Sequence, residues 1–468
     1  MNKSTVAVFL AITSLCSSLL TSCEEKKTGV TTPASPGASA PASQEGLKIG
    51  TLLSATGDVA SIAAPLPEAV KLVVKKANDC GGVNGQPVTV VSEDDQSKPD
   101  QGVAGMTKLT EQNKVAGVIG SFASSVSTAA ASVAVKNKVM LISPGSTSPV
   151  FTEKAKTGLY KGFWSRTAPS DVHQAPALAK LAFDKGFKSV ATVAINNDYG
   201  VGFEKEFVAA FKKLGGTVTN EAKPVRYDPK AASFASEVGA VFAGKPQAVA
   251  AIVYPDETGP LVIKAAYEQG LSKGVQLLFP DAGYSTDFPP KVGKGSDGKF
   301  ILAGSIGTVP GANGTAFKDF ETAWKGTGKP LAPYLAQSWD AGALMMLAAQ
   351  AAKTNTGEGI NSKMREVSSG DGEKVSDICK ALAMVKEGKK INYEGASGNV
   401  DIDENGDVIG SYDIWQVQPD GTLKVTGNVP VADPKATSKD PKSGAAPVAP
   451  KTETADPKVT KSPTPAKT

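Results

Sequence analysis

Two short loops rich in hydroxyl groups are the part of the chain best suited to binding chemistry. Two apolar runs, residues 115–120 and 139–142, predict β-strands, and each opens into a loop of serine and threonine. In a parallel sheet both loops emerge at the carboxyl ends of the strands, where α/β folds bind ligands. Free N–H groups at helix starts, with the hydroxyls of Ser124, Ser125 and Thr147, suit an anion such as a carboxylate. The alternative is that these residues only cap helices.

The elements that would position these loops follow a strand and helix rhythm. Strands are predicted at 47–53, 88–92, 115–120 and 139–142, separated by helices at 66–78, 101–112 and 125–138. The rhythm restarts after Pro169 and runs to residue 279, which predicts an α/β fold with two similar lobes on parallel sheets. Helical segments at 317–324, 335–352 and 375–385 exceed what the second lobe needs.

The two ends of the chain differ from this central part. Residues 1–22 have a short basic start and an apolar run typical of a secretory signal, too short and polar to span a membrane. The run ends in Leu20-Thr21-Ser22-Cys23, which resembles the lipobox of bacterial lipoproteins and predicts acylation of Cys23; an ordinary signal cleaved nearby is the alternative. Residues 23–46 predict a disordered tether, and residues 431–468 a disordered Pro- and Lys-rich tail.

Composition excludes several classes of function. Lys and Arg number 50 against 46 for Asp and Glu, so no strong charge indicates a nucleic-acid partner. The single histidine, His173, rules out histidine-rich metal sites and lies at a predicted helix start without a nucleophile elbow. No phosphate-binding loop or dinucleotide fingerprint occurs. The sequence therefore predicts no enzyme, no cofactor and no metal site.

Two further features leave alternatives open. Cys80 and Cys379 remain once the signal and the lipid site are set aside, and beyond an oxidising membrane they predict a disulfide, with free buried thiols as the alternative. Residues 401–407 have the first half of an EF-hand calcium loop, but Tyr412 stands where its bidentate glutamate belongs. The Asn-Gly pair at 405–406 favours a hairpin over 400–417 instead.

An ordered set of motifs identifies a family resemblance over residues 47–426. The motifs are Leu47-Lys-Ile-Gly, Thr56-Gly-Asp, Cys80-Gly-Gly-Val-Asn-Gly, Glu93-Asp-Asp, the loops at 120–125 and 142–149, Arg166-Thr-Ala-Pro-Ser-Asp171 and Asn197-Asp-Tyr-Gly. Together they closely resemble the type I periplasmic amino-acid-binding proteins, the leucine/isoleucine/valine-binding family of branched-chain ABC importers. The lipobox, the tail and residues 391–398 are most similar to cyanobacterial neutral-amino-acid-binding lipoproteins.

The resemblance implies an architecture. Two Rossmann-like lobes would be joined by a three-strand hinge in a Venus-flytrap arrangement, with ligand in the cleft between them. The first lobe would comprise residues 47–170 plus 310–411, and the second residues 171–309 plus 412–430.

The resemblance also assigns roles to residues. The carboxylate-binding serine falls on Ser124, and the loop that holds carboxylate and ammonium falls on Gly145, Ser146 and Thr147. Tyr199 and Tyr254 match the aromatic residues of the second lobe, and Asp281 matches the acid that meets the ammonium, with Asp256 as the rival. This acid is commonly glutamate in the family, and Ile62 stands where an aromatic residue is frequent, so the preferred side chain does not follow.

The expected function is therefore capture of a neutral, aliphatic or branched-chain, α-amino acid by a monomeric, lipid-anchored periplasmic receptor that delivers it to an ABC permease. In a bacterium with one membrane it would lie at the cell surface. The alternatives are an amide or urea receptor of the same fold, an extracellular sensory module, and, least supported, an enzyme.

Overall fold

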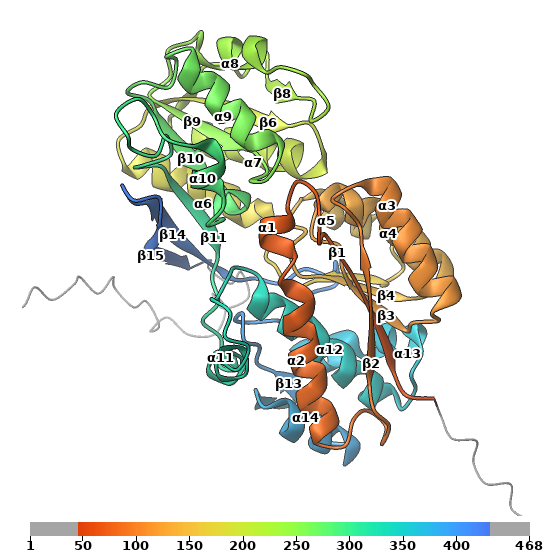
Figure 1. Ribbon diagram of the computed structural model, residues 1–468. Helices are drawn as coiled ribbons and strands as arrows, with labels where there is room; N and C mark the ends of the chain where they lie inside the picture. The colour runs from red at the N-terminus through yellow and green to blue at the C-terminus, as the bar shows by residue number, and fades with distance from the viewer. Residues whose placement is uncertain (1–44, 431–468) are drawn as a thin grey trace, which may run out of the picture. The chain divides into compact units, whose positions relative to one another are not determined.

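The computed structural model describes residues 45–430, which form two groups of strands and helices, each built on its own sheet (Figure 1). Cys23, the signal-like segment, most of the tether and the tail lie outside the described residues. Within residues 45–430, no helix combines the length and the apolar character needed to cross a membrane.

The first sheet is parallel and has the strand order β2-β1-β3-β4-β5. Its strands are β1 (Lys48–Leu53), β2 (Thr89–Asp94), β3 (Gly117–Gly120), β4 (Met140–Ser143) and β5 (Trp164–Arg166). Because β3 pairs with β4, the two hydroxyl-rich loops leave the sheet from neighbouring strands. We call this sheet and the helices packed on it the first lobe.

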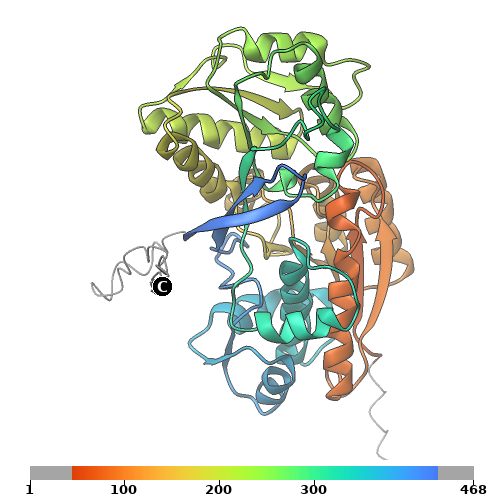
Figure 2. The ribbon, with the colours of Figure 1, turned by 60° about the vertical axis from the view of Figure 1, so that its left-hand side comes forward.

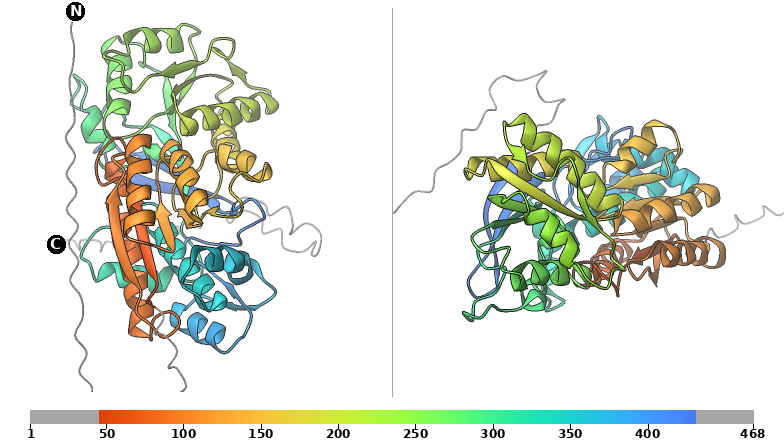
Figure 3. Two further views of the ribbon diagram at one scale, coloured as in Figure 1. Left: turned by 90° about the vertical axis from the view of Figure 1, so that its right-hand side faces the viewer. Right: turned by 90° about the horizontal axis from the view of Figure 1, so that it is seen from above.

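Helices from both ends of the described chain cover this sheet. They are α1 (Ala60–Ala63), α2 (Leu66–Asp79), α3 (Pro99–Thr107), η1 (Lys108–Gln112), α4 (Ser124–Asn137), α5 (Val150–Lys156), α11 (Phe317–Lys325), α12 (Leu335–Ala352), α13 (Gly357–Ser369) and α14 (Ile378–Lys386). The late helices α11, α12 and α14 pack against α2 (Figure 3, cyan and blue beside red). The surplus of predicted helices is thus used in the first lobe.

Sequence pattern explains how these helices pack. Apolar residues of α2 recur at three- and four-residue spacing and are buried: Leu66, Ala69, Val70, Val73, Val74 and Ala77. α12 is rich in Ala, Leu and Met and is buried from Leu335 to Gln350. It crosses β3 closely at Gly117, where a Cβ would collide with the sulfur of Met345. A larger residue at Gly117 would therefore push the central helix away from the sheet.

The second sheet has the order β15-β14-β11-β10-β9-β6-β7, with β8 also paired to β6. Its strands are β6 (Ser189–Ile195), β7 (Thr217–Val218), β8 (Val225–Tyr227), β9 (Ala248–Ile252), β10 (Gln276–Phe279), β11 (Ile306–Pro310), β14 (Ser411–Val417) and β15 (Leu423–Pro430). Its helices are α6 (Asp171–Asp184), α7 (Asp198–Lys213), α8 (Ala235–Phe242), α9 (Thr258–Glu268), η2 (Asp281–Gly283) and α10 (Phe288–Val292). We call this group the second lobe; a separate pair, β12 (Glu373–Val375) and β13 (Ile391–Tyr393), lies among the late helices.

Within residues 45–430, the chain passes between the two sheets three times. It leaves β5 for α6 through residues 167–170, leaves β11 for α11 through residues 311–316, and reaches β14 after β13 through residues 394–410. Figure 2 shows β14 and β15 in blue after the last passage. These strands pair antiparallel with β11 and with each other at the edge of the second sheet.

The predicted hairpin over residues 400–417 is wrong. Asn405 and Gly406 do form a tight turn, in which the Gly406 N–H donates to the Asp403 carbonyl (3.2 Å), but no strands flank it. The hairpin of this region is β14 with β15, closed at the Asp-Gly pair at 420–421. Both dipeptides favour a hairpin turn, but only the Asp-Gly pair is flanked by two segments that form paired antiparallel strands.

A disulfide joins Cys80, at the end of α2, to Cys379 in α14, with a Cα–Cα separation of 5.8 Å across 299 residues of sequence. We expect the Cys80→Ser/Cys379→Ser double variant to lose about 2–5 kcal/mol of unfolding free energy, because the unfolded chain regains the freedom of a very long loop. Urea denaturation of both proteins measures the difference. Two alkylatable thiols in the unreduced natural protein would contradict the pairing.

Candidate functional site

The loops after β3 and β4 are fastened to each other by a serine. The Ser146 hydroxyl lies 2.8 Å from the Ser127 hydroxyl and 3.1 and 3.2 Å from the carbonyl oxygens of Phe122 and Ser121. Gly145 packs so tightly on the Phe122 ring that a Cβ there would collide with it. These contacts tie the two loops into one rigid unit, and they occupy the Ser146 side chain.

Ser124 and Thr147 lie on this unit. Ser124 is the first residue of α4, is 2% exposed, and accepts the N–H of Ser148 at 3.4 Å. Thr147 is 1% exposed, and its hydroxyl donates to Asp171 Oδ2 at 2.9 Å. Because the first N–H groups of a helix have no intrahelical partner, the start of α4 offers donors beside these two hydroxyls. The unit can therefore bind an anion.

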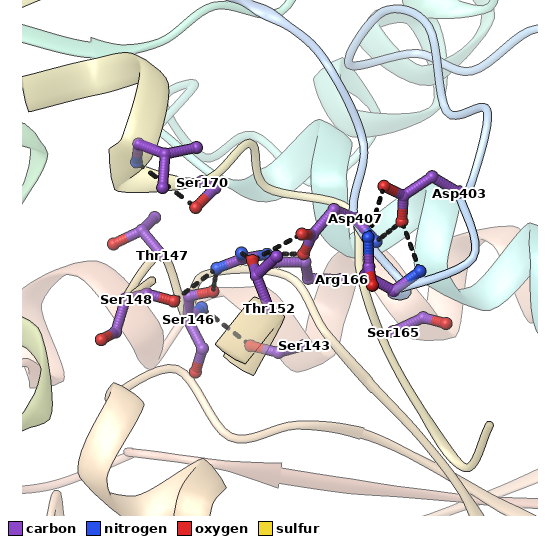
Figure 4. A network of polar contacts seen from close by, with 12 residues as sticks. Ser143, Ser146, Thr147, Ser148, Thr152, Ser165, Arg166, Ser170, Asp403 and Asp407 are labelled. Carbon is purple, nitrogen blue, oxygen red and sulfur yellow. Dashed lines mark hydrogen bonds and ion pairs between the residues drawn. The ribbon is translucent and has the colours of Figure 1, made fainter. Parts of the chain in front are cut away.

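The side chain of Arg166 supports the loop after β4 through hydrogen bonds to its backbone (Figure 4). Its side chain is fully buried, and Nη1 donates to the carbonyl oxygens of Ser146 (3.1 Å) and Ser148 (2.9 Å), on either side of Thr147. Nε donates to Asp407 Oδ1 at 2.7 Å. The loop conformation that presents Thr147 thus depends on an ion pair with a residue 241 positions away.

The calcium-like segment supplies this partner. Asp407 Oδ2 accepts the Thr152 hydroxyl at 2.6 Å, while Asp403 Oδ1 accepts the N–H groups of Asn405 (2.8 Å) and Asp407 (2.9 Å) (Figure 4). Two of the acids that suggested a calcium loop are therefore engaged by protein groups and serve to fix the turn and Arg166.

Two buried carboxyl groups face this region. Asp281 follows β10 and is 2% exposed; it accepts the hydroxyls of Tyr199 (2.8 Å) and Tyr334 (2.5 Å) on its two oxygens. Asp171 begins α6 and is fully buried, and its Oδ1 has no hydrogen-bond partner among residues 45–430. An unpaired buried carboxylate oxygen is costly unless a donor joins it.

Burial perturbs both acids. It raises the pKa of Asp171 well above its usual range, and the charge of Asp281 raises it further. Burial also raises the pKa of Asp281, against the hydrogen bonds from Tyr334 and Tyr199. Two neighbouring carboxyl groups with raised pKa values favour a cation between or beside them.

Aromatic rings complete the surroundings. Tyr199 stacks on Tyr254 with ring centroids 5.4 Å apart, and Tyr334 meets the Phe122 ring edge-on at 4.9 Å. Ile62 is buried in α1. The four aromatic rings offer apolar walls next to the polar groups.

The predicted site residues thus form one connected set. Ser124 contacts the loop of Gly145, Ser146 and Thr147, and Thr147 binds Asp171. The charge of Asp281 raises the pKa of Asp171, and Tyr199 donates to Asp281. Asp256 does not join this set: its carboxylate accepts the Ser61 N–H at 2.7 Å and pairs with Lys291.

Sequence reasoning missed Asp171, Tyr334 and Arg166. Asp171 lies at the start of α6, next to the N-cap Ser170, and the sequence assigned it no role of its own. Tyr334 precedes α12 in the left-handed region (φ 67°), and no local pattern connects it to Asp281. The signal that could have found Asp171 and Arg166 is their place together in the motif at 166–171, directly after a buried strand.

Comparison with known proteins decides the family. The model of the receptor family ligand binding region matches residues 66–420, most of the chain. The chain belongs to this family. The predicted resemblance and the α/β Venus-flytrap fold are confirmed, and the members compared below are solute-binding proteins.

Three proteins that are similar to this chain differ in the system or the ligand that their names give. A chemotactic signal transduction system substrate-binding protein, BasB of Halobacterium salinarum, is 27% identical over 380 residues, 80% of this chain and 87% of its own. The leucine-binding protein LivK of Thermotoga maritima aligns with a TM-score of 0.67 at 24% identity, covering 82% of this chain and 99% of its own. A Rhodopseudomonas palustris solute-binding protein in complex with 4-hydroxybenzoate aligns with a TM-score of 0.65 at 19% identity, covering 85% and 100%.

Proposed function

We propose that this protein captures a neutral α-amino acid between its lobes and delivers it to the permease of an ABC importer. The observation that carries the proposal is the pairing of two buried acids, Asp171 and Asp281, with an anion-binding unit at Ser124 and Thr147. A zwitterion presents the complementary charges at the same short spacing. The similarity to LivK supports the same ligand class.

Each part of the ligand has a partner in this arrangement. The carboxylate takes the Ser124 hydroxyl, the N–H groups at the start of α4 and the loop at Gly145 and Thr147. The ammonium donates to Asp171 Oδ1, the oxygen without a protein partner in the described chain. Hydrogen bonds from Tyr199 and Tyr334 fix the position of the Asp281 carboxylate. The ligand leaves chemically unchanged, since binding here needs only complementarity.

An aromatic carboxylate is the main competing ligand, because a neighbour of the same fold is known with 4-hydroxybenzoate. Such a ligand lacks an ammonium group and would leave Asp171 and Asp281 unpaired in a buried site. Urea and short amides can donate to the acids but leave the anion-binding unit empty. The two acids therefore favour an amino acid over both.

A sensory role is a second candidate, because BasB belongs to a chemotactic signal transduction system and matches most of this chain. The binding chemistry would be the same, and only the partner would differ. Co-purification of the membrane-bound protein with a permease or with a transducer distinguishes the two.

Thermal denaturation with a panel of amino acids, urea, acetamide and 4-hydroxybenzoate tests the ligand class. An aliphatic amino acid at a hundred times its Kd should add about 2.7 kcal/mol to the unfolding free energy. A rise in Tm with 4-hydroxybenzoate or urea, and with no amino acid, would refute the proposal.

We also propose that Cys23 is acylated and anchors the mature protein at the periplasmic membrane face, or at the cell surface of a bacterium with one membrane. Each buried methylene of an acyl chain contributes about 0.8 kcal/mol to membrane affinity. Cys23→Ala protein should therefore shift from the membrane to the soluble fraction. Unchanged fractionation, with no lipid mass on the natural N-terminus, would rule the anchor out.

A further inference from the structure

Asp58 of the first lobe binds the start of a helix in the second lobe. It lies between β1 and α1, and its Oδ1 accepts the N–H groups of Glu257 and Thr258, both at 3.0 Å. Its Oδ2 accepts the Thr258 hydroxyl at 3.1 Å. Helix α9 begins at Thr258, and no side chain at its own N-cap, Glu257, supplies a capping hydrogen bond. Asp58 therefore does, from the opposite lobe, what an N-cap residue ordinarily does.

Asp256 of the second lobe makes the reciprocal contact with the first lobe. Its carboxylate is 3% exposed, accepts the Ser61 N–H of the first lobe at 2.7 Å and pairs with Lys291 of its own lobe. Next to it, the hydroxyls of Ser61 and Ser285 lie 2.8 Å apart across the same junction. The backbone joins as well, since the Asp256 N–H donates to the Asp58 carbonyl at 3.3 Å. Each lobe thus presents one carboxylate to backbone N–H groups of the other.

We propose that Asp58 and Asp256 form a clasp that holds the lobes closed over the bound ligand and sets its rate of release. The proposal rests on the proposed function, because it assumes a ligand that binds between lobes. Neither residue contacts Asp171, Asp281 or the tyrosines that hold them, so the clasp acts on closure and not on ligand recognition. Contacts that exist only in the closed protein slow its opening when present and leave the open form unchanged.

The clasp is balanced so that it can open. Burial raises the pKa of Asp58 above its ordinary value in spite of the hydrogen bonds from Thr258 and Glu257. Desolvation of the carboxylate therefore offsets part of what those bonds contribute. A closed state stabilised in this way persists while ligand adds its own contacts to both lobes and reopens after they are lost.

Ligand dissociation from the Asp58→Ala protein tests the clasp. Ala removes both oxygens that accept from Glu257 and Thr258, so we expect release to accelerate about two- to thirtyfold, the range for loss of a helix cap. The association rate should stay within about twofold, and every ligand that binds should be affected alike. Asp184→Ala, which removes an exposed acid that pairs with Lys180 in the described chain, is the matched control and should release ligand like the natural protein. Equal release rates for Asp58→Ala and the control would overturn the proposal.

A second measurement needs no ligand. In a Ser61→Cys/Ser285→Cys protein the two new thiols replace hydroxyls that lie 2.8 Å apart, so oxidation should cross-link the lobes when they close. Adding Asp58→Ala should slow cross-linking severalfold, and cross-linking at an unchanged rate would refute the clasp. Because this assay reports closure alone, it separates failure of the clasp from failure of the ligand assignment.

Discussion

Proteins carrying Asp171→Asn or Asp281→Asn are expected to bind an α-amino acid about thirtyfold to several thousandfold more weakly than the natural protein. The substitution keeps the side-chain shape and removes the charge, and breaking a buried ion pair costs about 2–5 kcal/mol. The Asp171 variant should show the larger loss, because its Oδ1 is free to meet the ammonium, whereas both oxygens of Asp281 are held by tyrosines. Calorimetric titration measures the three affinities.

Control variants separate recognition from closure. Asp256→Asn should change binding only through release, since this acid faces Ser61 and Lys291. If Asp256→Asn abolishes binding while both site variants bind normally, the ammonium assignment moves to Asp256. Normal binding by all three proteins would mean that this site does not recognise an ammonium group.

The same acids predict the pH dependence of binding. Burial raises the pKa of Asp171 and Asp281 in the empty site, so protonation begins at a higher pH than for an ordinary carboxyl group. The ammonium binds the ionised acids, and binding must therefore release protons and weaken as the pH falls through these raised pKa values. Calorimetry in two buffers of different ionisation enthalpy should detect proton release that Asp171→Asn reduces. No proton exchange over the acidic range would contradict this.

Asp407→Leu is expected to lower the unfolding free energy by about 3–5 kcal/mol. It leaves the guanidinium of Arg166, whose side chain is fully buried, without its charged partner, and removing one member of a buried pair is more costly than removing both. Because Arg166 holds the carbonyl groups on either side of Thr147, ligand affinity should fall as well. Urea denaturation and ligand titration give the two quantities.

Asp401→Ala is the matched control for this prediction, because Asp401 lies in the same loop and its side chain hydrogen-bonds only to Asn399 in the described structure. Its stability should stay within about 0.5 kcal/mol of the natural protein. A similarly small change for Asp407→Leu would show that the ion pair does not support the loop.

Local sequence pattern predicted most of the fold. The spacing of apolar residues in α2 predicted a helix with one buried face, and the alternation of strands and helices predicted parallel sheets. The contact of Ser124 with the loop after β4 was also predictable, since loops after neighbouring parallel strands share one edge.

Contacts between residues that lie far apart in the sequence could not be predicted from local sequence pattern. Asp407 resembles a calcium ligand by spacing, and only the fold places it against Arg166. Tyr334 reaches Asp281 across 53 residues and from the other lobe, so no window of sequence contains both. The turn at Asn405 and Gly406 was recognised correctly, but its flanks have no neighbouring strand to pair with, whereas β14 and β15 do.

A calorimetric comparison of leucine with its two half-charged analogues tests most directly whether one site binds both charged groups of an amino acid. 4-Methylpentanoate keeps the carboxylate and lacks the ammonium, and 3-methylbutylamine keeps the ammonium and lacks the carboxylate. We expect leucine to bind and each analogue to bind at least about thirtyfold more weakly, because each leaves a buried polar group of the site unpaired. Binding of 4-methylpentanoate as tight as that of leucine would show that the site does not recognise the ammonium group.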